Sequence, residues 1–219
     1  MVQQERARVT REKIIFGAAD VIRRVGYANA SLGDIGEAAG VTKGALYFHF
    51  QSKEDIARAL IDEQHQTTRD AAAEILASDG SPVELMMRLC MDLASRLIDD
   101  PVVRAGIRLT TDSSTFDTPL IDPYSDWIAT FEQLAQRAED EGETNGRIPS
   151  DRLAQFIIPA FTGVQLVSEV FTSRKDLPAR VLAMWQVILT AIVPLGNLDA
   201  SLALAEKVFT PKPRRREKT

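Results

Sequence analysis

The chain has 219 residues, of which 45% are hydrophobic, and a formal net charge of −5 at pH 7. This composition supports a folded core and excludes wholesale disorder, and the length allows one large or two small domains. No uninterrupted apolar run is long enough to span a bilayer, and charged residues come too early for a signal peptide. We therefore expect a cytoplasmic protein with no membrane partner. The single cysteine, Cys90, is expected to be a buried small hydrophobe.

The charges are unevenly distributed along the chain. Residues 1–55 carry eight Lys and Arg against seven acidic residues, for a net charge of +1. Residues 207–219 carry six basic residues against one acidic residue, for a net charge of +5, which leaves −11 for the residues between. An acidic body repels DNA and leaves the basic ends to make the contacts. Residues 210–219 are expected to be a disordered basic tail, for which we favour a solvated end over nonspecific DNA binding.

The first predicted element is an amphipathic helix from about residue 8 to residue 25. Its apolar residues recur at helical spacing, and glycine at position 26 ends it. Arg8 lies near its start, where the helix N-terminus also favours an anion. We therefore expect Arg8 to meet a DNA phosphate.

Residues 31–50 predict two short helices joined by a tight turn. Ser31 is a suitable N-cap for the first helix, Gly40 can adopt the positive φ that ends it, and Thr42 caps the second. This pattern is typical of a helix-turn-helix, whose second helix lies in a DNA major groove. The alternative is a helical hairpin inside an all-α core that binds no nucleic acid.

The second helix of this motif carries the candidate DNA contacts. Lys43 can reach a guanine edge, and Gly44 lets the backbone approach the duplex. Phe48 and Phe50 are expected to lie in the core. The full set of predicted DNA contacts is Thr42, Lys43, Gly44, Tyr47, His49, Lys53, Arg8 and Ser31.

The rest of the chain predicts further helices and no strand, so the fold class is all-α. Capping pairs at Ser52 with Asp55 and at Ser81 with Glu84 mark two of the starts. Pro159 is expected to kink the helix that contains it. The predicted helices span about 53–77, 82–99, 101–111, 122–141, 150–172, 178–193 and 197–209, with a loop at 111–120 and a turn at 141–146.

The helices at about 150–172 and 178–193 are apolar nearly all round. Such helices are unstable alone in water, so we expect the pair to pack against its copy in a homodimer as a four-helix bundle. The alternative is a deep monomer core.

The segments 26–27, 31–35, 39–50 and 52–54 resemble the tetracycline-repressor (TetR) family. The resemblance implies an all-helical homodimeric regulator with a DNA-binding domain at 1–52, a ligand-binding and dimerisation domain at 53–209 and a tail at 210–219. Residues 100–109 and 123–127 resemble the actinobacterial γ-butyrolactone autoregulator receptors. That branch implies a repressor released from a palindromic operator by a lactone or butenolide, with its pocket tryptophan at Trp127.

A lactone or butenolide needs a dry pocket with an aromatic wall and a few hydrogen-bond donors. The predicted effector contacts are Trp127, Gln64, Thr162, Gln165, Phe131, Phe161, Leu89 and Trp185. We hypothesise that the effector shifts the helix that contains Gln64 and so moves the DNA-binding domain. The alternative is that these aromatics are plain core and that the polar groups bond internally.

An enzyme is disfavoured because the chain has only two histidines, His49 and His65, and no glycine-rich phosphate loop or metal-spaced cluster. No cofactor and no metal are expected. The sequence is also compatible with a DNA-binding protein that responds to no ligand, and with a regulator that binds an antibiotic or a different small molecule.

Overall fold

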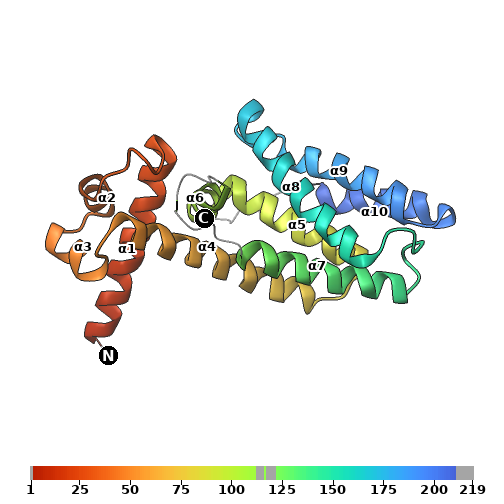
Figure 1. The fold of residues 1–219 in the computed structure, drawn as a ribbon, viewed down its shortest axis with the longest axis horizontal. Helices are drawn as coiled ribbons and strands as arrows, with labels where there is room; N and C mark the ends of the chain where they lie inside the picture. Colours follow the sequence, from red (N-terminus) through yellow and green to blue (C-terminus); the bar gives the residue numbers. More distant parts are fainter. Residues whose placement is uncertain (1, 112–115, 117–121, 211–219) are drawn as a thin grey trace, which may run out of the picture. The chain divides into compact units, whose positions relative to one another are not determined.

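A computed structural model describes residues 2–111, 116 and 122–210. Over these residues the chain is all-α, with one short 3₁₀ turn and no strand (Figure 1). The helices are α1 Val2–Val25, α2 Leu32–Ala39, α3 Lys43–His49, α4 Lys53–Leu76, α5 Pro82–Asp99, α6 Pro101–Thr111, α7 Asp122–Asp140, α8 Ser150–Thr172, α9 Leu177–Ile192, η1 Leu195–Asn197 and α10 Leu198–Phe209. The predicted loop at 111–120 lies almost entirely outside the described residues.

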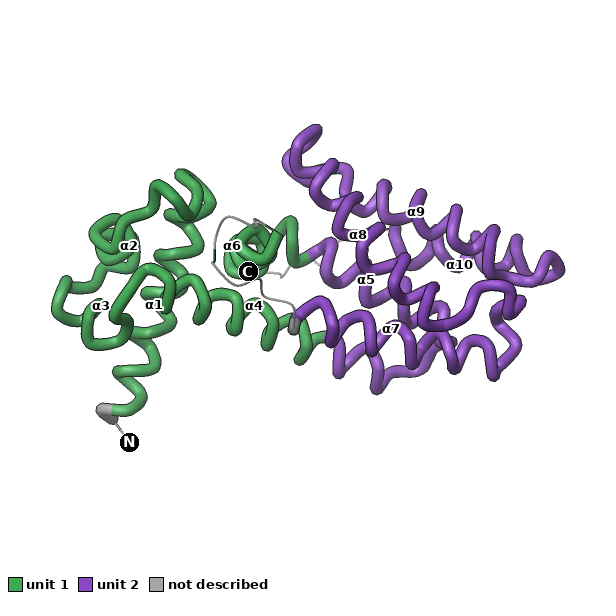
Figure 2. Tube along the Cα trace, viewed as in Figure 1, with its two compact units in different colours: residues 1–71, 96–121 green, residues 72–95, 122–219 purple. Residues whose placement is uncertain are grey.

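The chain divides into two compact units (Figure 2). The first contains residues 1–71 and 96–121, and the second contains residues 72–95 and 122–219. The first unit therefore extends beyond the boundary expected at residue 52, because most of α4 and all of α6 pack with the N-terminal helices. The functional boundary at residue 52 stays a prediction.

The first unit is built around one buried apolar cluster contributed by α1, α2, α3, α4 and α6. Ile14, Ile35, Leu46 and Ile56 are fully or almost fully buried in it. Gly17 lets α1 and α2 approach closely, because an added Cβ would lie 2.7 Å from the Ala39 backbone nitrogen. The angle at which α2 and α3 leave α1 is therefore set by a backbone-to-backbone contact.

Helix α1 begins at Val2, about six residues before the predicted start. Charged pairs on its first turns account for the extension. Arg8 forms ion pairs with Glu5 and Glu12, at spacings of three and four residues that place the side chains side by side on a helix. The prediction placed the start where the apolar face begins, but local ion pairing continues the helix beyond it.

Helix α6 packs on α1 and α4 within the first unit. Gly106 of α6 lies against the Gln64 side chain of α4, where an added Cβ would come within 2.6 Å of the Gln64 Cβ. Gln64 is buried, and its Nε2 donates to Thr68 Oγ1 at 3.3 Å. Gln64 and Thr68 are therefore internal polar residues of α4.

The second unit contains α7 packed on α8, an α8–α9 hairpin, and α10 packed on α9. Ser173 and Arg174 turn the hairpin with positive φ angles. The hydroxyl groups of Ser168 and Thr172 donate to Asp176 Oδ1 at 2.6 and 2.7 Å. These bonds, with Arg180, lower the pKa of Asp176 to about 2, so the carboxylate remains charged and ties the two helices together.

Helix α8 departs from one expectation. By length and composition it is apolar enough to cross a membrane, whereas no such run was expected from the sequence. Only 33% of its most apolar stretch is buried within the chain. The core helix of a soluble protein can have the same length and apolar composition. The distinctive feature of α8 is its exposed apolar face, which is expected to contact another apolar surface.

Candidate nucleic-acid interface and effector site

Local hydrogen bonds define both helices of the predicted helix-turn-helix. Ser31 Oγ accepts from the Asp34 amide at 3.1 Å, and Asp34 Oδ2 accepts in return from the Ser31 amide. Gly40 ends α2 with a φ of 63°, and Thr42 Oγ1 accepts from the Ala45 amide at 3.2 Å to start α3. The predicted caps and turn are confirmed.

The two faces of α3 differ sharply. Leu46 and Phe50 are buried in the first unit, whereas Phe48 is 78% exposed and Tyr47 is 41% exposed. The expectation that Phe48 lies in the core is therefore wrong, and the expectation for Phe50 is confirmed. Leu46 and Phe50 are four residues apart on one face, so Phe48 between them must point to the opposite side. The spacing separates Phe48 from Leu46 and Phe50, and the packing of the first unit decides which of these two faces is buried.

The exposed side of this motif gathers most of the predicted DNA contacts. Ser31, Thr42, Lys43 and Gly44 are exposed at the starts of α2 and α3, and His49 is half-buried and packs edge-on against Phe48. An added Cβ at Gly44 would meet nothing within 4 Å, so the chain itself does not need a glycine there. The exposed ring of Phe48 adds a large apolar contact to this surface, suited to a thymine methyl group or a sugar.

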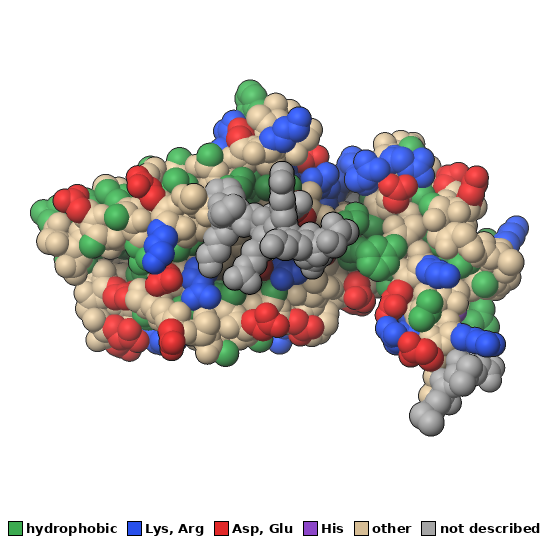
Figure 3. All heavy atoms as spheres, turned by 180° about the vertical axis from the view of Figure 1, so that it is seen from behind, with side chains coloured by type: hydrophobic (Ala, Val, Ile, Leu, Met, Phe, Trp, Pro, Cys, Tyr) green, Lys and Arg blue, Asp and Glu red, His purple; other side chains and the backbone are tan. Residues whose placement is uncertain are grey.

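Charge on this face agrees with the predicted distribution. Figure 3 shows Lys and Arg side chains over the first unit with Asp and Glu side chains among them, and rows of Asp and Glu side chains along the lower edge of the second. An acidic second unit leaves the first as the part that a polyanion approaches.

Lys53 has a different surrounding from the one predicted. Its ammonium donates to the carbonyl oxygens of Tyr27 at 2.9 Å and Ala28 at 3.2 Å, and it lies over the Tyr27 ring at 4.5 Å. The Tyr27 ring in turn contacts Phe116, and the Arg58 guanidinium lies 4.9 Å from the Phe116 ring centre. Lys53 therefore ties α4 to the connection between α1 and α2, and its DNA contact stays a prediction.

Arg8 is exposed on α1, but two carboxylates hold its guanidinium. Its Nη2 lies 2.6 Å from Glu5, and its Nη1 contacts Glu12. The Glu5 hydrogen bond is the main cause of a pKa raised above the usual value for arginine. Arg8 would have to exchange these partners for a phosphate, so its predicted contact is weaker than that of Lys43.

Substitution by alanine should therefore affect operator affinity at Lys43 and thermal stability at Lys53. Lys43→Ala should cost about 1–3 kcal/mol of operator affinity and relax base preference, with little change in Tm, because this ammonium is exposed. Lys53→Ala should lower Tm, because two backbone carbonyls lose a charged donor. Titration of operator variants and thermal melts measure both effects. Equal operator affinity for Lys43→Ala and wild type would contradict the base-contact role.

Seven of the eight predicted effector residues lie in the second unit. Leu89 of α5, Phe131 of α7, Phe161 of α8 and Trp185 of α9 are buried, and Trp127 of α7 is half-buried. The eighth, Gln64, lies in the first unit, where it packs on Gly106. Its predicted ligand contact stays a prediction.

The two polar residues predicted on α8 differ in their bonding. Thr162 is half-buried and donates to the Ile158 carbonyl of its own helix at 3.0 Å. Gln165 is buried, and its Oε1 accepts from Arg174 Nη2 at 2.8 Å. Arg174, which also pairs with Glu169 at 3.2 Å, is a buried cation that was not expected from the sequence. Its position in the hairpin turn offers no helical spacing that would indicate burial.

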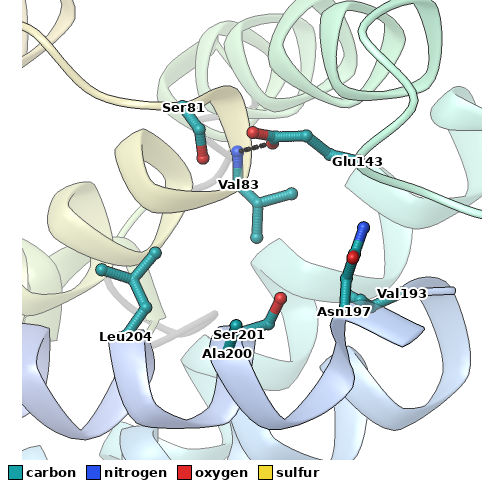
Figure 4. A pocket seen from close by; sticks show the side chains of 8 residues that line it. All are labelled: Ser81, Val83, Glu143, Val193, Asn197, Ala200, Ser201 and Leu204. Atoms are coloured by element: carbon teal, nitrogen blue, oxygen red, sulfur yellow. Dashed lines mark hydrogen bonds between the residues drawn. The ribbon is translucent and has the colours of Figure 1, made fainter. Parts of the chain in front are cut away.

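A cavity of about 240 Å³ lies elsewhere in the second unit, between the start of α5, the α7–α8 turn and α10 (Figure 4). None of the predicted effector residues lines it. Glu143 Oε2 in its wall accepts from the Val83 amide at 2.9 Å. The Ser81 side of the predicted capping pair is present, since Ser81 Oγ accepts from the Glu84 amide at 3.4 Å. Glu143 thus acts as a second cap for α5.

An exposed, capped second helix on a buried core of helices α1 to α4 and α6, in a chain with a separate helical unit, defines a helix-turn-helix regulator. Residues 14–60 match the bacterial regulatory proteins of the tetR family, and residues 80–194 match the tetracyclin repressor-like C-terminal domain. The chain belongs to the TetR family of bacterial regulatory proteins.

Relatives extend the likeness over nearly the whole chain. The A-factor receptor protein of Streptomyces griseus is 35% identical over 216 residues, which cover 94% of this chain and 75% of that protein. A solved γ-butyrolactone receptor (ArpA-like protein) aligns with a TM-score of 0.80 at 33% identity over 93% of this chain and 98% of its own. CprB from Streptomyces coelicolor, solved with its operator sequence, aligns with a TM-score of 0.82 at 32% identity over 94% and 100%.

Proposed function

We propose that this chain is a transcriptional repressor that binds a palindromic operator as a homodimer and leaves it when a γ-butyrolactone or butenolide binds. The observation that carries the proposal is the likeness to the A-factor receptor protein across both units, at 35% identity over 94% of the chain. The operator complex of CprB supports the DNA-binding half of the proposal. Such a repressor acts in the cytoplasm, where the operator is.

The exposed face of the α8–α9 hairpin supports the homodimer. On α8, Phe156, Val167 and Val170 are exposed at helical spacing, and on α9 Val187 is 68% exposed. A contiguous apolar patch of this kind marks an interaction site. A second copy would present the same face, so that two hairpins form a four-helix bundle and cover each other.

The second unit supports the effector half of the proposal. Its predicted residues combine buried aromatic rings with buried polar groups, which a small oxygenated ring compound requires. Trp127 is half-buried on α7, so its indole is partly accessible to a ligand. A ligand that binds against Trp127 would shift α7. This helix follows directly in sequence from the first-unit segment 96–121, so its movement can be passed to the first unit.

Release requires that the effector bind the released state more tightly than the DNA-bound state. Neighbouring major grooves on one DNA face are about 34–36 Å apart, and a dimer must match that spacing. Because Gly106 and Gln64 leave no space between α6 and α4, these helices should move together with the DNA-binding helices. A shift of α4 and α6 would then change the half-site separation.

Gel mobility of an operator fragment tests the whole proposal. The wild-type dimer should retard the fragment and release it when a 2-acyl-γ-butyrolactone is added. Trp127→Leu should bind the same fragment and release it poorly, because the indole wall and its N–H are lost. At a ligand concentration of 100 Kd, the wild-type protein should also gain about 2.7 kcal/mol of stability.

Two results would count against the proposal in different ways. Retention of the complex with every lactone and butenolide would remove the effector class but leave the repressor. Failure to bind any duplex at low salt would remove the repressor itself. Ala203→Leu, at an exposed position on α10 outside the proposed dimer face, serves as the control for release.

A further inference from the structure

The amide of Gln165 has a fixed orientation. Arg174 has only donors, so the Gln165 atom that faces its Nη2 at 2.8 Å must be the oxygen. The Gln165 Nε2 group therefore points away from Arg174. This group is fully buried and has no hydrogen-bond partner among the described residues. Gln165 itself is 1% exposed.

A second buried donor lies on the partner helix of the hairpin. Trp185 of α9 is 0% exposed, and its Nε1 also makes no hydrogen bond to the described part of the chain. The Cys90 thiol of α5 faces this indole. Burial raises the pKa of Cys90 to about 12 and outweighs the lowering by its weak contact with Trp185, so the group stays a neutral thiol. A thiol sulfur is a weak acceptor and does not satisfy an indole N–H.

The two donors lie at the same level of the hairpin. Gln165 is seven residues before the end of α8 at Thr172, and Trp185 is eight residues after the start of α9 at Leu177. At about 1.5 Å per residue, each lies roughly 10–12 Å from the turn along its helix. Both side chains are buried, so both lie on the inner face of the second unit.

We propose that Gln165 Nε2 and Trp185 Nε1 form a subsite that binds a carbonyl oxygen of the effector. This inference rests on the proposed function and names the chemistry of its ligand. Buried donors in folded proteins nearly always have an acceptor, and here two of them lie at one level of the helical hairpin. The acceptor is a ketone or ester carbonyl on the substituent or ring of a small lipophilic molecule.

The groups around Gln165 determine whether a carbonyl, a hydroxyl or a carboxylate oxygen of the ligand binds best. A hydroxyl must also donate, but the Gln165 oxygen faces Arg174 and not the atom that Nε2 binds, and Trp185 Nε1 is a donor only, so neither group accepts the hydroxyl proton. A carboxylate needs a spare positive charge, but Arg174 already pairs with Glu169 at 3.2 Å. The subsite therefore prefers a neutral carbonyl over an alcohol or an acid.

The test is calorimetric titration of the full-length dimer with matched probes. The probes are a 2-acyl-γ-butyrolactone, the alcohol formed by reducing its side-chain ketone, and the corresponding 2-alkyl lactone. A simple ketone and alcohol pair, 2-nonanone and 2-nonanol, is titrated in parallel. The wild-type protein should bind each ketone about tenfold more tightly than its alcohol, and Gln165→Leu should abolish that preference.

Gln165→Glu is the informative variant. Its carboxylate keeps the contact with Arg174 and replaces the amide donor with an acceptor, so the preference should invert toward the alcohol. A purely structural role for Gln165 would lower all affinities alike and leave the ranking unchanged. Gln155→Leu, at an exposed position on the same helix, should leave both affinity and ranking as in wild type.

Trp185 gives an independent readout. The chain has two tryptophans, so a proton–nitrogen correlation spectrum contains two indole signals, and Trp127→Phe leaves only that of Trp185. The Trp185 indole proton should shift downfield with the ketone and much less with the 2-alkyl lactone, which has no side-chain oxygen. An indole signal that ignores the ketone while the ketone binds would overturn the subsite.

The outcomes separate the subsite from the proposed function. Lactone binding with equal affinity for ketone and alcohol overturns the subsite alone. A ketone preference in the nonanone pair without lactone binding overturns the lactone assignment and supports the subsite. Binding of neither series overturns both.

Discussion

Aspartate at both Val170 and Val187 should convert the proposed dimer into monomers and reduce operator affinity by about 10²- to 10⁴-fold, because the two half-sites are then bound independently. Val170 is 83% exposed at the end of α8, and Val187 is 68% exposed on α9. Charges in the centre of a helical bundle would be buried without partners, which no dimer of this form tolerates. Light scattering on a sizing column and gel mobility measure the two effects.

The exposed position of both valines makes this variant easy to interpret. Neither valine contributes to the core of its own chain. The double variant should therefore keep the helical fold of the single chain, and circular dichroism should show the same helix content as in wild type. Ala203→Asp on α10 is the matched control, since it introduces the same charge at another exposed position of the second unit. A double variant that remains dimeric and binds the operator normally would place the dimer interface elsewhere.

Gly17→Val should destabilise the DNA-binding helices by about 1–3 kcal/mol or more and abolish operator binding at physiological temperature. An added Cβ at Gly17 would lie 2.7 Å from Ala39 N and 3.0 Å from Ala39 Cα. These are backbone atoms, so α2 must move away from α1 and carry α3 out of position. Thermal melts monitored by circular dichroism, with operator titrations below the melting temperature, separate the two consequences.

Gly44→Ala is the matched comparison and should behave in the opposite way. Its Cβ would meet nothing within 4 Å, and alanine favours a helix over glycine, so Tm should be unchanged or slightly raised. Operator affinity should nevertheless fall, because the added methyl group keeps the α3 backbone from the duplex. A Gly17→Val protein as stable as wild type would show that α1 and α2 can separate without cost.

Helix ends and turns were predictable because their causes are local. Ser31, Gly40 and Thr42 act through atoms within three or four residues along the chain, so residue type and spacing suffice. The start of α1 was predicted too late, because the spacing of apolar residues does not reveal helical turns that are stabilised by ion pairs. The resemblance of the helix-turn-helix to its family was strong for the same local reason.

The roles of individual side chains were less predictable. Four consecutive residues at the end of α3, Tyr47 to Phe50, point in directions about 100° apart, so some must face solvent whatever their polarity. Only the position of the α1 core shows that Phe50 is inside and Phe48 is outside. Lys53 looked like a phosphate contact, but the carbonyls it binds lie more than twenty residues away in sequence.

The sequence by itself determined the all-α class, the helix boundaries from α2 onward to within a residue or two, the helix-turn-helix and the family, because short-range hydrogen bonds and 3.6-residue periodicity are written in neighbouring residues. Tertiary structure alone decided that α6 joins the first unit through Gly106 and that Phe48 is exposed. It also decided that Gln165 and Trp185 are buried donors at one level of a hairpin. These depend on which distant surfaces come into contact, and a linear pattern does not carry that information.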